Sequence, residues 1–143
     1  MKRIFIIAAV ALFSNFSYAD EPTPKVLDAF NRTFKFVKEV SWDEYNNQYE
    51  AKFSQNDIRL SVVYDEDGNV VRTIRYYFEE SLPILIRSRV AKKFEGKKIY
   101  GVTELSSQDD LSYTIVLQDE THWYNVRSDA YGNMTIEKKM KKA

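Results

Sequence analysis

The 143-residue sequence contains no cysteine, four glycines, three prolines and one histidine. Without cysteine the chain has no disulfide and no thiolate metal site, so core burial and backbone pairing must stabilise the fold. With His122 as its single histidine, the chain also lacks a multi-histidine metal site. The scattered glycines form no glycine-rich phosphate-binding loop. We therefore expect neither a bound metal nor a cofactor.

The sequence also lacks an excess of charge of either sign. Lysine and arginine together number 21, and so do aspartate and glutamate. Lys2 and Arg3 belong to an N-terminal leader, and its removal leaves 19 basic residues against 21 acidic ones, a net charge of −2. Such a near-neutral chain lacks the basic footprint of a nucleic-acid-binding protein, so we expect no nucleic-acid partner.

The one long apolar run lies at the N-terminus. It covers Ile4–Phe13, follows two basic residues, and at about ten residues is too short to span a bilayer. Ser17-Tyr18-Ala19 then matches the small-x-small cleavage pattern, which predicts a signal peptide over 1–19 that is removed after Ala19. The alternative is an uncleaved membrane anchor. We expect a periplasmic or secreted protein without a transmembrane segment after cleavage.

Hydrophobic spacing beyond the leader predicts a helix followed by strands, and then the same order again. Thr23 is expected to cap a helix that starts at Pro24 and covers 24 to about 35. The apolar period then changes from 3.6 to 2, which is typical of strands with one buried face. The pattern restarts at Ser81, the expected cap of a second helix with Pro83 just inside its start. Later strands are expected over 98–105, 111–118, 121–128 and 133–139.

The two halves match each other at a fixed offset. Shifting the chain by 64 positions aligns Tyr49 with Tyr113, Asp65 with Asp129, Gly68 with Gly132 and Asn69 with Asn133. We interpret this as a tandem duplication, with a first helix-plus-sheet repeat over 20–79 and a second over 80–143 that ends in a basic tail. One copy is too small for a stable core, so we expect both to share one sheet with both helices on the same face.

Short motifs also follow one another in a recognisable order. They are Ala29-Phe30, Phe34, Val40-Ser41-Trp42, Tyr49-Glu50-Ala51, Phe53, Tyr64-Asp65, Gly68, Leu82-Pro83 and Ala91-Lys92-Lys93-Phe94. This order resembles the β-lactamase-inhibitor-like (BLIP-like), PepSY-like family of periplasmic proteins, over roughly 24–138. The resemblance implies an α+β fold in which tandem units of a helix plus antiparallel β-sheet form two layers. It implies no catalytic or binding residues.

Catalytic motifs are missing although reactive residue types are present. His122 is the one conventional general base at neutral pH, and no serine lies in a G-x-S-x-G pattern. Asp109-Asp110 and Glu79-Glu80 are expected in solvated loops. We therefore predict that the protein is not an enzyme, with an unfamiliar hydrolase acting through His122 as the minor alternative.

The acidic run Asp65 to Asn69 superficially resembles the start of a calcium-binding loop. Val70 and Tyr76 stand where such a loop needs glycine and glutamate. The run therefore indicates a polar hairpin turn, with Gly68 supplying a positive φ.

Aromatic residues make up 15% of the chain and gather at two places, Tyr76-Tyr77-Phe78 and His122-Trp123-Tyr124. Strand alternation sets Tyr77 and Trp123 apart from Tyr76 and Tyr124, and we expect Tyr77 and Trp123 to point outward. Exposed tyrosine and tryptophan on an open sheet are typical interface anchors. The alternative is ordinary cross-strand stabilisation. The predicted protein-binding residues are Tyr77, Trp123, Arg75 and Arg127, and the predicted partner is a protein or peptide of the cell envelope.

Two basic clusters offer a different kind of function. One lies on or after the second helix and contains Arg87, Arg89, Lys92, Lys93, Lys97 and Lys98; the other is the tail with Lys138, Lys139, Lys141 and Lys142. They are either a solvated helix face and a frayed terminus, or a patch for an acidic protein or anionic envelope component. The second reading predicts an envelope-associated structural or stress-response protein.

Overall fold

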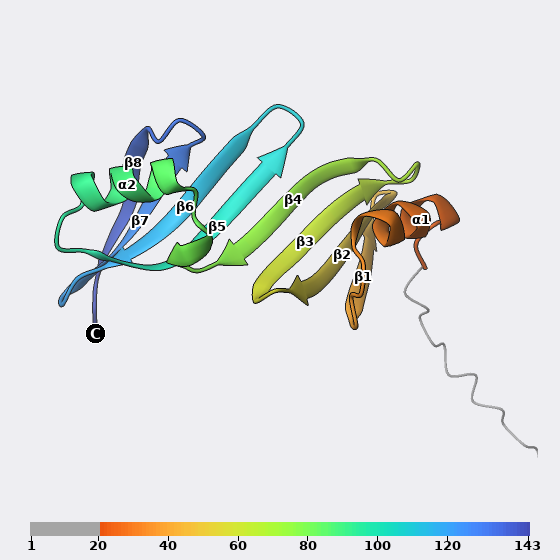
Figure 1. The fold of residues 1–143 in the computed structure, drawn as a ribbon, viewed down its shortest axis with the longest axis horizontal. Helices are drawn as coiled ribbons and strands as arrows, with labels where there is room; N and C mark the ends of the chain where they lie inside the picture. The colour runs from red at the N-terminus through yellow and green to blue at the C-terminus, as the bar shows by residue number, and fades with distance from the viewer. Residues whose placement is uncertain (1–20) are drawn as a thin grey trace, which may run out of the picture.

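A computed structural model describes residues 21–143, which form a single antiparallel sheet and two α-helices (Figure 1). The predicted signal peptide, 1–19, lies outside the described residues. The eight strands are adjacent in chain order: β1 (Val40–Tyr45), β2 (Gln48–Gln55), β3 (Ile58–Asp65), β4 (Val70–Tyr77), β5 (Lys98–Ser107), β6 (Leu111–Gln118), β7 (His122–Asp129) and β8 (Met134–Lys141). Helix α1 (Pro24–Thr33) precedes β1, and a 3₁₀ turn η1 (Glu79–Ser81) and helix α2 (Ile84–Lys93) connect β4 to β5. Neither helix in this range has the length and apolarity that a membrane crossing requires.

The two helices begin in different ways. Helix α1 starts as predicted, because the Thr23 hydroxyl accepts a hydrogen bond from the Val26 amide at 3.3 Å. The predicted Ser81 cap of α2 is wrong. Ser81 ends η1, in which the Leu82 amide donates to the Glu79 carbonyl at 3.1 Å, and the helix starts only after Pro83.

The β3–β4 and β7–β8 turns have the same construction. The Asp65 carboxylate accepts the Asn69 backbone and side-chain amides at 2.9 Å each, and Asp129 accepts those of Asn133 at 2.9 and 2.7 Å. These bonds lower the pKa of both carboxyl groups. Gly68 has a φ of +84°, so the predicted hairpin turn is confirmed. Common ancestry of the two halves stays a prediction.

Both helices cover the same face of the sheet. One row of directly opposed residues crosses every strand on that face: Val40, Phe53, Leu60, Arg75, Glu104, Tyr113, Ser128 and Met134. Opposed residues in an antiparallel ladder point to the same side. Phe53 belongs to the core beneath α1, whereas Tyr113 and Met134 belong to the core beneath α2. The expected sharing of one sheet and one helix face is therefore confirmed.

A charged pair lies in the middle of this row, between the two cores. The Arg75 guanidinium donates from Nη1 to Oε1 of Glu104 at 3.0 Å, and the Tyr77 hydroxyl donates to Oε2 at 2.5 Å. Glu104 is only 9% exposed. Burial, followed by the Glu104 hydrogen bond, raises the pKa of Tyr77. We call Arg75, Tyr77 and Glu104 the seam.

The seam shows that the predicted orientation of Tyr77 is wrong. Tyr77 was expected to point outward, but it is 4% exposed and packs in the core beneath α2, on the same face as Arg75. Tyr76 is the residue of this strand that points to the opposite face, with 39% exposure. The alternation along β4 was predicted correctly, but its phase was wrong. The covered face of this strand carries the polar residues Thr73 and Arg75, which the sequence pattern does not identify as covered.

The expected basic tail is largely strand. Lys138, Lys139 and Lys141 lie in β8, at one edge of the sheet, and the Lys142 amide donates to the Thr121 carbonyl at 2.8 Å. The β7–β8 ladder shifts register beside Asn125. Lysines and a bulge on an edge strand hinder pairing with another chain.

The first prediction concerns the seam. Arg75→Met should lower the free energy of unfolding by about 1–3 kcal/mol, because it leaves a buried carboxylate without its cation. The control is Lys52→Met, which removes the solvent-accessible ion pairs to Asp43 and Glu50, whose side chains are 58% and 28% exposed, and should cost less than about 1 kcal/mol. Adding Glu104→Met to Arg75→Met should restore part of the loss. Urea unfolding measures all four proteins, and equal losses for the two single variants would contradict the assignment.

The second prediction concerns Tyr64, whose buried hydroxyl has no hydrogen-bond partner among the described residues. Burial raises its pKa from 10.0 to about 12, so the native state keeps the phenolic proton at pH values where the unfolded chain loses it. Stability that depends on this proton falls as the pH rises above about 10.

Tyr64→Phe should therefore be at least as stable as the wild type at pH 7, by up to about 1 kcal/mol. The stability of the variant relative to the wild type should increase between pH 9 and pH 11. Urea unfolding midpoints of both proteins, measured at these two pH values, test this. Tyr45→Phe is the matched control, because Tyr45 is 78% exposed. A Tyr64→Phe variant that is less stable than the wild type would mean that the hydroxyl has a partner.

Candidate binding face

The face of the sheet opposite the helices, here the open face, carries a polar row that ends in two arginines. The directly opposed residues of this row, from β3 to β7, are Arg59, Tyr76, Thr103, Thr114 and Arg127. The Arg59 guanidinium carbon lies 5.4 Å from the centroid of the Tyr76 ring, which is a cation–π contact. Arg127 lies 3.9 Å from Glu137, and both side chains are about half exposed. The arginines therefore frame a neutral stretch of sheet.

An apolar pair lies in the neighbouring row of the same face. Ile74 on β4 is directly opposite Leu105 on β5. Leu105 is 39% exposed and Ile74 is half-buried, although neither described helix covers this side. Ser61 and Ser112 flank the pair in the same row. An apolar contact area is thus available beside the arginine row.

An aromatic corner occupies the part of the open face nearest the C-terminus. Trp123 on β7 is opposite Gln118 and Met140, and its ring meets Tyr100 edge-on, with centroids 4.9 Å apart. Tyr100 is 58% exposed. The Lys142 ammonium lies 4.7 Å from the Trp123 centroid. Tyrosine and tryptophan in such partly exposed settings are enriched in protein interfaces.

The acidic side chains of the open face are engaged within the molecule. Lys52 pairs with Asp43 at 2.7 Å and with Glu50 at 3.4 Å, and Glu50 also accepts a hydrogen bond from the Ser61 hydroxyl. The turn bonds described above occupy Asp129. By contrast, Arg59 forms no ion pair with any residue of 21–143. The open face therefore retains unpaired positive charge.

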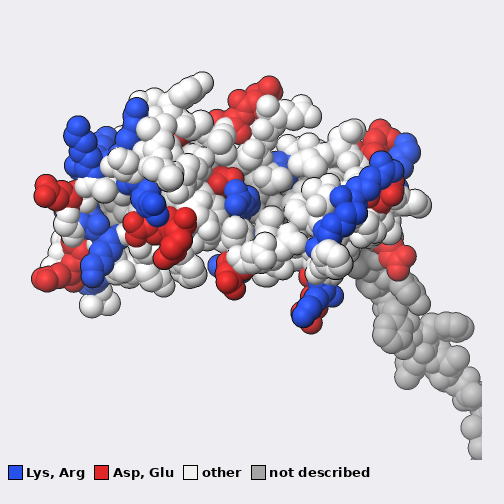
Figure 2. Space-filling model, viewed as in Figure 1, with Lys and Arg blue, Asp and Glu red and all other residues white. Residues whose placement is uncertain are grey.

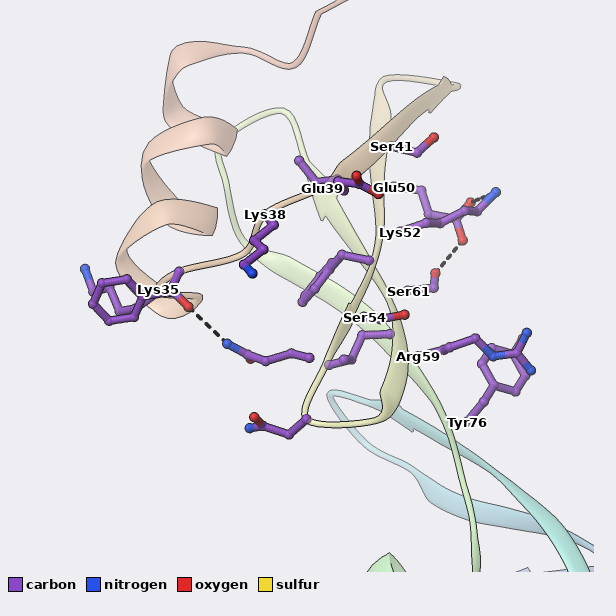
Figure 3. Close-up of a pocket in the computed structure, with 16 residues that line it drawn as sticks. Lys35, Lys38, Glu39, Ser41, Glu50, Lys52, Ser54, Arg59, Ser61 and Tyr76 are labelled. Atoms are coloured by element: carbon purple, nitrogen blue, oxygen red, sulfur yellow. Dashed lines mark hydrogen bonds and ion pairs between the residues drawn. The ribbon is translucent and has the colours of Figure 1, made fainter.

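A broad hollow, open to solvent, lies where the α1–β1 connection meets the ends of β2 and β3 (Figure 3). The Gln55 side chain donates to the Lys35 carbonyl at 3.0 Å on one side, and Arg59 and Tyr76 lie together on the other. Phe36, at its rim, is 98% exposed and has a φ of +60°. A bulky residue rarely adopts that conformation. The hollow is lined from both faces of the sheet, by Phe53 and Leu60 of the covered row and by Arg59 of the open face.

The predicted binding residues are divided between the two faces. Trp123 and Arg127 lie on the open face, as strand alternation predicted for Trp123, whereas Arg75 and Tyr77 lie in the seam. Tyr100 was not among the predicted residues, because a register shift between Ile99 and Gly101 breaks the alternation there. The pairing of Ile74 with Leu105 was not predicted either, because it depends on the long-range β4–β5 register. Whether Trp123 and Arg127 bind a partner stays a prediction.

The basic residues near α2 do not form one free patch. The Lys93 ammonium donates to the Met134 carbonyl at 2.7 Å, Lys97 lies 3.8 Å from Asp119, and the Arg89 side chain packs over Gly132. In Figure 2, acidic and basic side chains alternate along the visible side of the molecule. Arg87 and Lys92 remain available on the helix for an anionic partner.

His122 is the first residue of β7, directly after the β6–β7 turn. Its ring Nδ1 is 2.7 Å from the Thr121 hydroxyl, and its backbone amide donates to the Asp119 carboxylate at 2.8 Å. Asp119 also accepts the Tyr124 hydroxyl, and this bond is the main cause of its lowered pKa. These contacts are those of a hydrogen-bonded turn.

Three solved structures share this fold at low sequence identity. A BLIP-like protein from Bacteroides fragilis has a TM-score of 0.64 and 13% identity, with 86% of this chain and 89% of that chain covered. A DUF2874 family protein from Bacteroides ovatus has a TM-score of 0.62 and 16% identity, with 85% and 89% covered. A Bacteroides eggerthii protein provisionally assigned to the periplasm has a TM-score of 0.61 and 14% identity, with 85% and 89% covered.

Comparisons at the level of sequence give no further assignment. No protein-family model matches the chain, and no curated protein matches it. Identities of 13–16% show a common fold and nothing about activity. The PepSY-like part of the resemblance therefore stays a prediction, while the chain has the BLIP-like fold that its sequence predicts.

Proposed function

We propose that this protein is an exported, non-catalytic binding or inhibitor-like module that docks a protein or peptide on its open face. The observation that carries the proposal is the set of aromatic and apolar side chains left exposed on a sheet face that no described helix covers. Tyr76, Leu105 and Tyr100 are all between 39% and 58% exposed. When a partner buries side chains of this kind, they supply most of the binding energy of the interface.

The proposed location of the protein, and with it the source of the partner, rests on the leader and on one structural neighbour. The leader over 1–19 and the provisional periplasmic assignment of one structural neighbour support export. We therefore propose a partner from the cell envelope. The matching turns at Asp65 and Asp129 support a further proposal, that the halves 20–79 and 80–143 are tandem copies of one unit.

The rival proposal is an envelope-associated structural or stress-response protein that acts through the basic face of α2. It rests chiefly on Arg87 and Lys92, because Arg89, Lys93 and Lys97 contact other residues of this chain. An exposed pair of charges binds weakly and loses its effect in salt. The open face is therefore the stronger candidate.

The third prediction tests the open face with a crosslinked pull-down from the native envelope fraction, quantified by mass spectrometry. Trp123→Ala combined with Arg127→Ala should reduce enrichment of the specific partner at least about fivefold, because the loss of even one interface anchor costs more than about 1 kcal/mol. Circular dichroism would confirm that the variant is folded.

Tyr131→Ala is the matched control, because Tyr131 is 76% exposed and lies in the β7–β8 turn. It should leave enrichment unchanged. Unchanged enrichment with the Trp123/Arg127 variant would remove the open face as the binding site. Loss of the partner with Arg87→Ala and Lys92→Ala instead would favour the rival proposal.

A further inference from the structure

We infer that the partner segment is acidic, with carboxylates that meet Arg59 and Arg127 and an apolar side chain that packs on Ile74 and Leu105. This inference rests on the proposed function and names the chemistry of the partner. It is argued from three features of the open face: the placement of its arginines, the engagement of its carboxylates and the position of its apolar pair.

The arginines stand at the two ends of one row. Arg59 on β3 and Arg127 on β7 are separated by four strand spacings, with Tyr76, Thr103 and Thr114 between them. At about 4.8 Å per spacing, the two are about 19 Å apart. The side chains between them in this row are uncharged, so a segment lying along the row meets positive charge at each end; Arg72 on β4 lies on the same face, two rows away.

The charge balance of the face favours a negative partner. Lys52, Ser61 and the β7–β8 turn already occupy the carboxylates of Asp43, Glu50 and Asp129. Arg59 is held by the Tyr76 ring, with its N–H groups free of ion pairs within 21–143, and the Arg127 contact to Glu137 is long at 3.9 Å. A guanidinium binds a carboxylate through two parallel hydrogen bonds, which makes arginine well suited to this task.

The apolar pair fixes where the partner needs a hydrophobic residue. Ile74 and Leu105 lie on β4 and β5, between the strands that carry the arginines, and in the adjacent row. In an extended segment, with about 3.3 Å per residue, two carboxylates about 19 Å apart are about six positions apart. The apolar side chain then lies two positions from the carboxylate residue that meets Arg59, because side chains of an extended segment alternate between its two sides.

The experiment uses a capped synthetic peptide with two glutamates six positions apart, a leucine two positions inward from each glutamate and serines elsewhere, so that all four side chains lie on one side of the extended chain. A second peptide, with lysines in place of both glutamates, is its control. Each is titrated to millimolar concentration into the ¹⁵N-labelled mature protein, and amide shifts are followed by NMR. The glutamate peptide should shift amides of β3 to β7 around Ile74 and Leu105, and added salt should weaken its binding.

Variants then separate charge recognition from general adhesion. Arg59→Gln with Arg127→Gln should weaken binding of the glutamate peptide about tenfold, the sum of two exposed ion pairs. The matched variant Arg87→Gln with Lys92→Gln, on α2, should leave it unchanged. Leu105→Ser should also weaken binding, because it removes part of the apolar contact.

Several outcomes would overturn the inference. These are the absence of shifts on the open face at millimolar glutamate peptide, equal binding of the lysine peptide, or binding that the arginine variants do not weaken. If the pull-down still retrieves a partner that the Trp123/Arg127 variant loses, the binding module stands and only the acidic chemistry fails. If that partner is also retained by the variant, both proposals fail.

Discussion

The register between β4 and β5 is the constraint on which the rest of the structure depends. These strands pair across the η1–α2 connection, and Arg75 lies directly opposite Glu104. Side chains alternate along a strand with a period of two residues. A slip of one residue would therefore move every side chain of β5 to β8 to the opposite face of the sheet. Helix α2 would then lie on the other side of the sheet from α1 and would cover half of the open face.

The ion pair of the seam favours one β4–β5 register over the others. It lies between the two cores. In the observed pairing, Glu104 receives both the Arg75 guanidinium and the Tyr77 hydroxyl. A slip of two residues would keep the faces but place Glu104 opposite Thr73 or Tyr77, and would leave a buried carboxylate without its opposed cation. A buried ion pair adds little net stability compared with an apolar pair, but a broken one is costly. We interpret the seam chiefly as a device for specificity.

The same register builds the open face. It brings Ile74 against Leu105 and joins Arg59 to Arg127 through one continuous row. These residues come from both halves of the chain, so neither half carries the whole surface. The two edges of the sheet also differ, because β8 carries lysines and a bulge whereas β1 carries Asp43 and Glu44. Lysines and a bulge therefore discourage strand addition at the β8 edge.

The sequence by itself determined the features that arise from local chemistry. Thr23 and Pro24 start a helix, Asp65 and Gly68 close a turn, and the alternation around Trp123 sets its face, because each depends on neighbours within a few residues. The tertiary structure alone decided which side of β4 is covered. That strand has apolar residues in both phases, and the polar residues of the seam, which β5 satisfies, lie on the covered side. Tyr77 and Tyr100 could not be placed beforehand, because a distant pairing and a bulge decide where they point.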